Sequence, residues 1–229
     1  MTIAMHMGTR RRRSRVDGVH AISRLYTTLV VLTFLAFSAC GGRQPNNDVP
    51  PETAPLPTAG IAGQEVPVYP LTLVVSEEVL GWSDYLSPRR EALDHADSLI
   101  AALLTERAPE VAWVLPEALR RAASRAPGML ANPDQMGTAL LRSPLERVPD
   151  PLRSQLRTLT GMAGGQYALL PASLVFLSDS SGMGRAELTL AIVDVRTAQV
   201  QWRTVASGLG HDPWEATWEA LKSLVPGLP

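Results

Sequence analysis

The chain has 229 residues, of which 45% are hydrophobic and 19% are charged, and its formal net charge at pH 7 is −1. The single cysteine excludes an internal disulfide, so stability has to come from a packed core. Six of the 21 basic residues lie within the first 24 positions, and without them the chain is acidic, which makes a nucleic-acid-binding domain a poor candidate.

The first 39 residues have the pattern of a secretory signal. Six arginines and one aspartate occupy residues 1–24, and an apolar run follows at residues 25–39. That run is too short to cross a bilayer as a helix, which takes about 20 residues. Basic, apolar and small residues in this order predict a signal peptide over residues 1–39.

The residues before Cys40, Phe37-Ser38-Ala39, resemble the lipobox of bacterial lipoproteins, with phenylalanine where leucine is usual. In that family the cysteine carries a diacylglyceryl group, the signal is cut just before it, and the new amino terminus is also acylated. The resemblance implies lipidation at Cys40 and a membrane anchor, and Gly41 after the cysteine implies the outer membrane, facing the periplasm. The alternative is an ordinary secreted protein that is cut near residues 36–38.

Cleavage before Cys40 would leave 190 residues with 15 basic and 21 acidic side chains, a net charge of about −6. A domain of that sign is a poor candidate for binding phosphate backbones or anionic lipid headgroups. Residues 40–66 contain five prolines and few large apolar groups, so we predict a lipidated cysteine followed by an extended, solvated tether. Residues 67–229 should then form a single globular periplasmic domain.

Apolar periodicity predicts the elements of this domain in the order β-α-β-α-irregular-α-β-β-β-α. They are a strand in "VYPLTLVV", a helix over 88–107 capped by Ser87, a buried strand over 111–115, a helix over 116–125, an irregular stretch over 126–149 with a short helix at Asn132-Pro133, a helix from 150, strands over 166–177, 186–195 and 200–205, and a final helix. This order predicts an α/β (α+β) fold with a mixed sheet of about five strands, helices packed on it, and a C-terminal antiparallel meander before the terminal helix.

The final helix has a complete start signal. Asp212 is a capping residue, Pro213 suits the first helical position, and Glu215 completes a capping box. Trp214 and Trp218 fall on one face, so this helix should belong to the core.

The hairpin "LAIVDVRTAQVQW" resembles a group of envelope lipoprotein domains. The group includes the curli-secretion lipoprotein, the outer-membrane activators of peptidoglycan synthases and the amino-terminal domain of the Tol-Pal translocation protein. Its members have an aspartate, a Thr-Gly turn and a closing tryptophan, which correspond to Asp194, Thr197, Ala198 and Trp202. Alanine disfavours the left-handed backbone conformation that glycine accepts, so a turn of different geometry is an alternative at this position. The resemblance implies a binding and assembly role without catalysis.

The residues themselves offer no catalytic set. His95 lies beside Asp94 and Asp97 on a helix, where a solvated face is the simpler interpretation than a metal site, and His211 precedes a helix cap. The sequence has no nucleophile elbow, Walker loop or zinc-protease motif. We therefore predict no catalytic residue, no metal and no cofactor.

The loop over residues 77–90 is the best candidate for an interface, through Trp82, Tyr85, Arg89 and Arg90. Aromatic residues and arginine are enriched at interface centres, although the aromatic pair could equally pack under the loop. The expected partner is an envelope protein that this domain recruits, activates or scaffolds through the loop or a sheet edge. The alternatives are a subunit of an oligomeric secretion complex, with homo-oligomers, and a protein that binds a small molecule or glycan.

Overall fold

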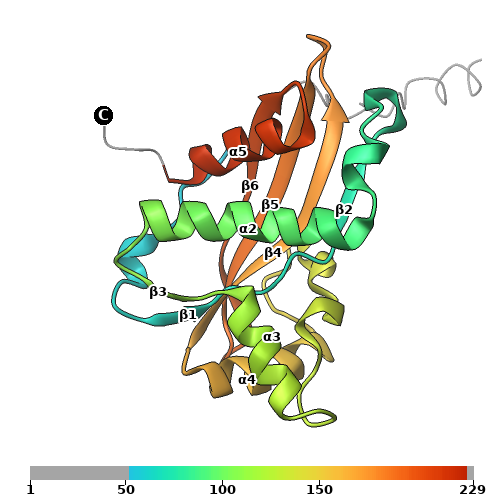
Figure 1. Ribbon diagram of the computed structural model, residues 1–229. Coiled ribbons are helices and arrows are strands. Elements are labelled where there is room, and N and C mark those ends of the chain that lie inside the picture. Colours follow the sequence, from blue (N-terminus) through green and yellow to red (C-terminus); the bar gives the residue numbers. More distant parts are fainter. Residues whose placement is uncertain (1–51, 226–229) are drawn as a thin grey trace, which may run out of the picture. The chain divides into compact units, whose positions relative to one another are not determined.

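The computed structural model describes residues 52–225 (Figure 1), and the predicted signal peptide and Cys40 lie outside the described residues. The helices are α2 (Arg89–Arg107), α3 (Pro116–Arg125), α4 (Leu152–Ala163) and α5 (Pro213–Leu224). The strands are β1 (Glu65–Pro67), β2 (Val74–Ser76), β3 (Ala112–Val114), β4 (Tyr167–Ser178), β5 (Gly184–Asp194) and β6 (Gln199–Gly210). Short 3₁₀ turns connect them, including η2 (Glu78–Leu80), η3 (Ser83–Leu86), η4 (Pro133–Gln135) and η5 (Thr138–Arg142).

The strands form a four-stranded sheet in the order β2-β4-β5-β6 and a two-stranded sheet of β1 and β3. β2 runs parallel to β4, whereas β4, β5 and β6 form the antiparallel meander that the sequence predicts. The α+β class, the mixed sheet and the terminal helix are therefore confirmed. Of the expected first strand over "VYPLTLVV", only the end forms a strand of the larger sheet, β2, which begins at Val74, and Val68 makes an isolated bridge to Leu169. β1 lies just before that stretch, ends at Pro67 and pairs with β3.

Two hydrophobic cores lie on opposite faces of the four-stranded sheet. Alternate residues of β5 separate them: Leu188, Leu190 and Ile192 belong to the core with α2 and α5, and Ala191 and Val193 belong to the core with α4. Figure 1 shows α2 and α5 crossing one face of the sheet, with α3 and α4 at its lower end. The alternation of the strand thus decides which helices cover which face.

α5 lies very close to β6 because the strand has glycine where the helix crosses it. A Cβ atom on Gly208 would lie 2.1 Å from the backbone nitrogen of Ala220, and one on Gly210 would lie 2.4 Å from that of Ala216. The Asp212 carboxylate caps the helix by accepting hydrogen bonds from the N–H groups of Trp214 and Glu215, as predicted. Leu221 and Leu224 then fill the core beneath.

Three local predictions need correction. Pro88 has an extended backbone and stands at the cap position, so α2 starts at Arg89 and the Ser87 hydroxyl does not cap it. β3 is partly exposed rather than buried, because its side chains lie at the rim of the small sheet. In the hairpin turn Ala198 itself adopts the left-handed conformation, with φ of 61°, so the turn keeps the geometry that glycine would provide.

The tether prediction does not hold for residues 52–66. Leu56, Ile61 and Val66 are buried in the core with α2 and α5. The N–H of Leu56 donates to the carbonyl of Leu224 at the end of α5, over 2.9 Å. A few apolar side chains among prolines are enough to hold this segment against the domain, because each buries its surface in an existing core.

Candidate functional site

β2 forms one edge of the four-stranded sheet, and within residues 52–225 no strand pairs with its outer side. The carbonyl of Leu73 accepts from the N–H of Leu174, and the N–H of Glu77 donates to the carbonyl of Phe176, so these residues face β4. Since peptide groups alternate sides along a strand, those of Val74 and Ser76 point to the outer edge. An edge of this kind can pair with a strand from another chain.

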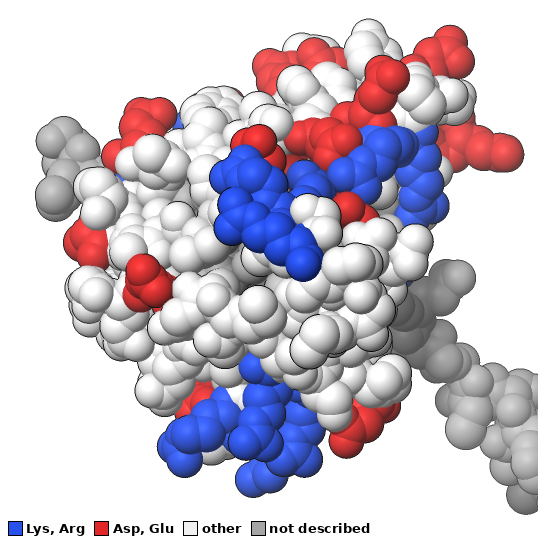
Figure 2. All heavy atoms as spheres, turned by 60° about the horizontal axis from the view of Figure 1, so that its bottom comes forward, with Lys and Arg blue, Asp and Glu red and all other residues white. Residues whose placement is uncertain are grey.

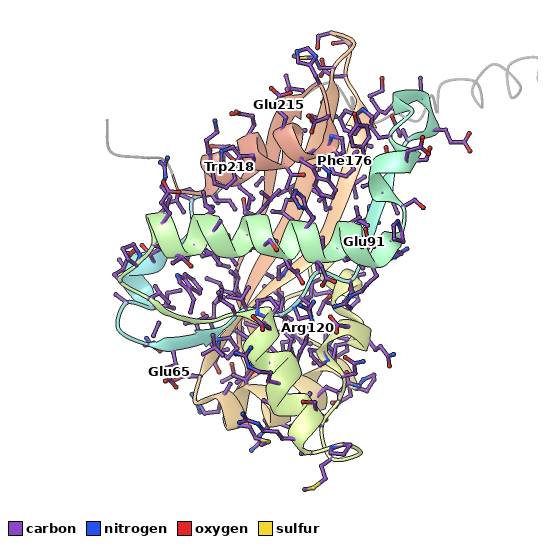
Figure 3. The ribbon with its side chains drawn as sticks, in the orientation of Figure 1. Glu65, Glu91, Arg120, Phe176, Glu215 and Trp218 are labelled. Atoms are coloured by element: carbon purple, nitrogen blue, oxygen red, sulfur yellow. The ribbon has the colours of Figure 1, made fainter. Side chains whose placement is uncertain are left out.

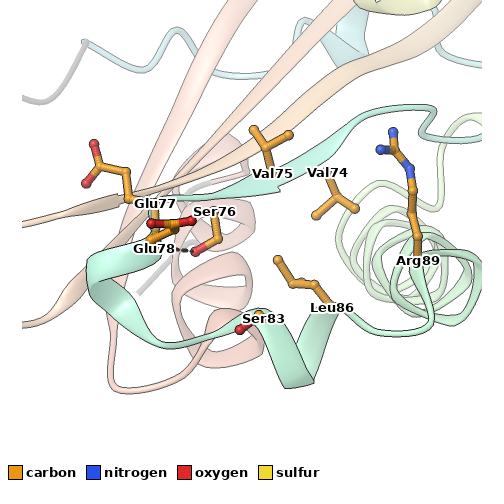
Figure 4. Close-up of a pocket in the computed structure, with 8 residues that line it drawn as sticks. All are labelled: Val74, Val75, Ser76, Glu77, Glu78, Ser83, Leu86 and Arg89. Carbon is orange, nitrogen blue, oxygen red and sulfur yellow. Dashed lines mark hydrogen bonds between the residues drawn. The ribbon is translucent and has the colours of Figure 1, made fainter.

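A groove of about 560 Å³ lies beside this edge (Figure 4). β2 and the turn that follows it form one wall, and η3 and the start of α2 form the other. The lining residues are Val74, Val75, Ser76, Glu77, Glu78, Ser83, Leu86 and Arg89. The size falls within the range of ligand-binding clefts, about 300–1,000 Å³.

The two ends of the groove carry opposite charges. Glu77 and Glu78 follow β2 directly, and both are exposed, although Glu77 also accepts a hydrogen bond of 2.7 Å from the N–H of Ser178. At the other end the guanidinium of Arg89 donates to the outward carbonyl of Thr72, over 2.9 Å. The groove is therefore electrically polar along the direction of β2.

Three exposed apolar side chains lie on the segment that carries the groove. Val79 is 77% exposed, Tyr85 is 53% exposed and Val75 is 39% exposed. All three lie within eleven consecutive residues that include β2, η2 and η3. Large apolar groups in one exposed patch are typical of a contact surface.

Of the predicted interface residues, Trp82 is buried, so for this residue the packing alternative holds. Its ring meets Phe176 edge to face, with centroids 5.4 Å apart, and a Cβ on Gly184 would lie 1.9 Å from it. The ring thus anchors the loop to the β4–β5 hairpin and shapes the groove wall from beneath. Arg89 is exposed and lines the groove, and Tyr85 is exposed next to Leu86, which lines it.

Arg90 points instead into an ionic cluster between α2, α3 and η4. It binds Asp94 through two hydrogen bonds of 2.8 Å and reaches Asp134 over 3.1 Å. Arg120 of α3 binds Asp97 over 2.7 Å and Asp134 over 2.8 Å (Figure 3). The sequence prediction missed this cluster, because its members are separated by up to 44 residues.

Asp97 is the buried member of the cluster, so the expectation of a solvated helix face is wrong for this residue. Its carboxylate accepts from the N–H of Leu71 over 2.8 Å, which fixes the chain just before β2. Burial raises the pKa of Asp97 to about 6, although the hydrogen bonds from Leu71 and Arg120 oppose that rise. The sequence contains one signal of this burial: Asp97 lies between Ala96 and Ile100, within the apolar stripe of the helix.

The two histidines within residues 52–225 take structural positions. His95 packs edge to face on Trp214, with ring centroids 4.4 Å apart, and the backbone N–H of His211 donates to the carboxylate of Glu215. In the described part of the chain, no group of three or more His, Cys, Asp or Glu side chains could hold a metal ion. No described helix is both long and apolar enough to span a membrane.

The chain matches no protein-family model, and no curated protein matches it. Among solved structures, the LpoB C-terminal domain from Salmonella enterica is 17% identical, with 64% of this chain and 82% of that chain covered and a TM-score of 0.36. A PelC dodecamer from Paraburkholderia phytofirmans is 16% identical, with 76% and 92% covered and a TM-score of 0.36. Lipoprotein GNA1162 from Neisseria meningitidis is 17% identical, with 64% and 81% covered and a TM-score of 0.33. The LpoB domain and the lipoprotein GNA1162 are fold-level matches at low identity.

Proposed function

We propose that this chain is a lipid-anchored, non-catalytic binding domain of the cell envelope, and that its β2 edge takes up an extended segment of another envelope protein. The observation that carries the proposal is the outward-facing peptide groups of Val74 and Ser76 beside a groove with oppositely charged ends. Main-chain hydrogen bonds along such an edge supply affinity, and the flanking side chains supply selectivity.

The groove chemistry defines the segment that would fit. It is an extended stretch with a basic residue toward Glu78, an acidic residue toward Arg89, and apolar side chains between them that contact Val74 and Leu86. Because the edge strand has three residues, the pairing is short and most of the selectivity has to come from the groove walls.

A matched pair of variants at Ser76 tests this mode of binding. Ser76→Pro removes the outward N–H at an edge position where proline is tolerated, and Ser76→Ala keeps that N–H. A photoreactive aromatic residue at position 85 of the full-length protein, expressed in its native envelope, reports the capture. We expect Ser76→Ala to keep a crosslink to an extended segment identified by mass spectrometry, and Ser76→Pro to lose at least about 90% of it.

Two outcomes contradict the proposal. Equal crosslinking in the proline and alanine variants would mean that the edge is not used. A crosslink confined to further copies of this chain would replace the partner with a homo-oligomer.

The proposed anchor has its own test, because Cys40 lies outside the described residues. The support for it is the apolar run and the small residues that precede the cysteine. We expect fatty-acid labelling of the full-length protein to disappear in Cys40→Ala and to persist in Ser38→Thr. Labelling that survives Cys40→Ala would leave the ordinary secreted protein as the better account.

A further inference from the structure

The charges of the described residues are divided very unevenly along the chain. Residues 116–163, from α3 to α4, contain seven arginines and four acidic residues, a net charge of +3. The other described residues contain seven basic and sixteen acidic side chains, a net charge of −9. The net charge of the domain is negative although one end of it is positive. The expectation that the domain does not bind anionic lipid headgroups was drawn from the net charge and therefore does not apply to that end.

Figure 2 turns the α3–α4 end toward the viewer. Blue lysine and arginine side chains form one group at the lower edge of this view and another toward the upper right, where they adjoin the red acidic side chains, with uncharged surface between the two groups. α3 and α4 pack against each other, so their outer faces belong to one surface. The distribution suits a broad anionic surface better than a single small anion.

α4 has the arrangement of an amphipathic helix with a basic outer face. Leu152, Leu156 and Leu159 are buried in the core, and Arg153 and Arg157 are exposed one turn apart on the other side. α4 has no acidic residue, and no acidic side chain in the described part of the chain pairs with either arginine. Two like charges in this arrangement repel each other, which a bound anionic surface would relieve.

α3 contributes one further arginine of the same kind. Arg125 is exposed in the last turn and has no ion pair among residues 52–225. Arg121 by contrast is paired with Glu117 over 2.7 Å, and Arg120 belongs to the ionic cluster. Arg142 and Arg147, between the two helices, are also exposed without an ion pair among residues 52–225, so the unpaired positive charge comes from five positions, of which 125, 153 and 157 lie on α3 and α4.

Two exposed methionines lie at the same end. Met129, directly after α3, is 83% exposed, and Met162, in the last turn of α4, is 60% exposed. A long, flexible apolar side chain is costly to leave in water and can enter the boundary between lipid headgroups and acyl chains. Exposed arginines together with exposed apolar side chains are the combination found in proteins that lie on membranes.

We infer that the α3–α4 end of the domain docks on an anionic lipid surface, with Arg125, Arg153 and Arg157 on headgroup phosphates and Met129 and Met162 among the headgroups. The two methionines favour lipid over an acidic protein, because a purely electrostatic partner has no use for them. This contact is separate from the β2 groove. It would orient the domain on a membrane whether or not the groove is occupied.

The methionines provide the readout. The full-length protein, labelled with ¹³C at its methionine methyl groups, is incorporated into nanodiscs of phosphatidylcholine alone or with phosphatidylglycerol, each doped with a gadolinium headgroup lipid. We expect the methyl signals of Met129 and Met162 to broaden in the anionic discs and to recover at high salt. Met136, which is 1% exposed, is the internal control.

Charge reversal at Arg153 and Arg157 should lower the equilibrium constant for docking by at least about 30-fold, the loss expected from removing the two positive charges alone. The matched control reverses Arg107 and Lys222, which lie on α2 and α5 and change the net charge equally.

Equal broadening in both disc types, or equal loss in the two double variants, would overturn the proposal. Broadening by polyaspartate but not by anionic discs would overturn it too and assign the surface to an acidic protein. Neither result depends on crosslinking at the β2 edge, so it would not bear on the proposed function.

Discussion

The two edges of the four-stranded sheet differ in how their backbone groups are covered. β6 is a twelve-residue strand, and segments from distant parts of the chain lie along it. The N–H of Val200 donates to Glu146, the N–H of Ala54 donates to the Thr204 hydroxyl, and the Thr53 hydroxyl donates to Val205. β2 has three residues and its outward peptide groups face a groove. The first part of the long edge is covered by other segments of the chain, whereas the short edge has no partner strand among residues 52–225, and covering a long edge limits general aggregation while a short one stays available for strand addition.

The structure of the β6 edge depends most on the close packing of α5 against this strand. Gly208→Ala would place a methyl group 2.1 Å from the helix backbone at Ala220, so α5 would have to move. We expect a loss of at least about 3 kcal/mol in the free energy of unfolding, measured in urea. Gly161→Ala is the control, because nothing lies within 4 Å of that position on α4, and it should stabilise by up to about 1 kcal/mol. Similar stability for the two variants would contradict the packing described for α5.

The chain leading into β2 depends on Asp97, which gives stability a pH dependence. The pKa of Asp97 is about 6 in the folded protein and 3.8 in the reference state. As the pH rises, the unfolded chain therefore loses this proton before the folded protein does. The contribution of Asp97 to the free energy of unfolding is largest below pH 4, and it falls by ~3 kcal/mol in total as the pH rises through about 6.

Asp97→Asn tests that dependence, because an amide can still accept from the N–H of Leu71 but does not titrate. We expect the decrease in stability between pH 4 and pH 6.5 to shrink by ~2 kcal/mol relative to the parent chain in urea titrations. The control is Asp94→Asn at the exposed side of the same cluster. An unchanged pH profile in Asp97→Asn would mean that Asp97 is not the titrating group.

The cover of the β6 edge is held by Leu56, and its removal should have a smaller effect. Leu56→Ala removes a side chain that is 8% exposed and should cost about 2 kcal/mol. Leu209→Ala, at a position on β6 that is 38% exposed, should cost less than about 0.5 kcal/mol. Equal effects would mean that residues 52–66 do not stabilise this edge.

The smallest effect on stability is expected at the β2 edge itself. Ser76→Ala removes a hydroxyl that donates to the neighbouring Glu77 carbonyl over 3.2 Å, an exposed bond. We expect a change within about 0.5 kcal/mol in the free energy of unfolding. A larger loss in the free energy of unfolding would show that this edge stabilises the fold and is not available for a partner.

Local patterns predicted the meander and α5 because each signal lies within a few residues of its effect. The alternation of Leu188, Leu190 and Ile192 sets the face of β5, and Asp212 caps its own helix. The open edge of β2 was not predictable in this way, since it results from pairing with β4, about 100 residues away. Burial of Trp82 and Asp97 likewise depends on Gly184 and Arg120, which come from other elements.

The most direct test of the central claim compares the two edges at equal exposure. Val75 on β2 is 39% exposed and Leu209 on β6 is 38% exposed, so one photoreactive residue at either position has similar access to solvent. In the full-length protein in its native envelope, we predict that position 75 captures an extended segment of another envelope protein, that Ser76→Pro abolishes this capture, and that position 209 captures little. Stronger capture from position 209, or capture from position 75 that is indifferent to Ser76→Pro, would contradict the account.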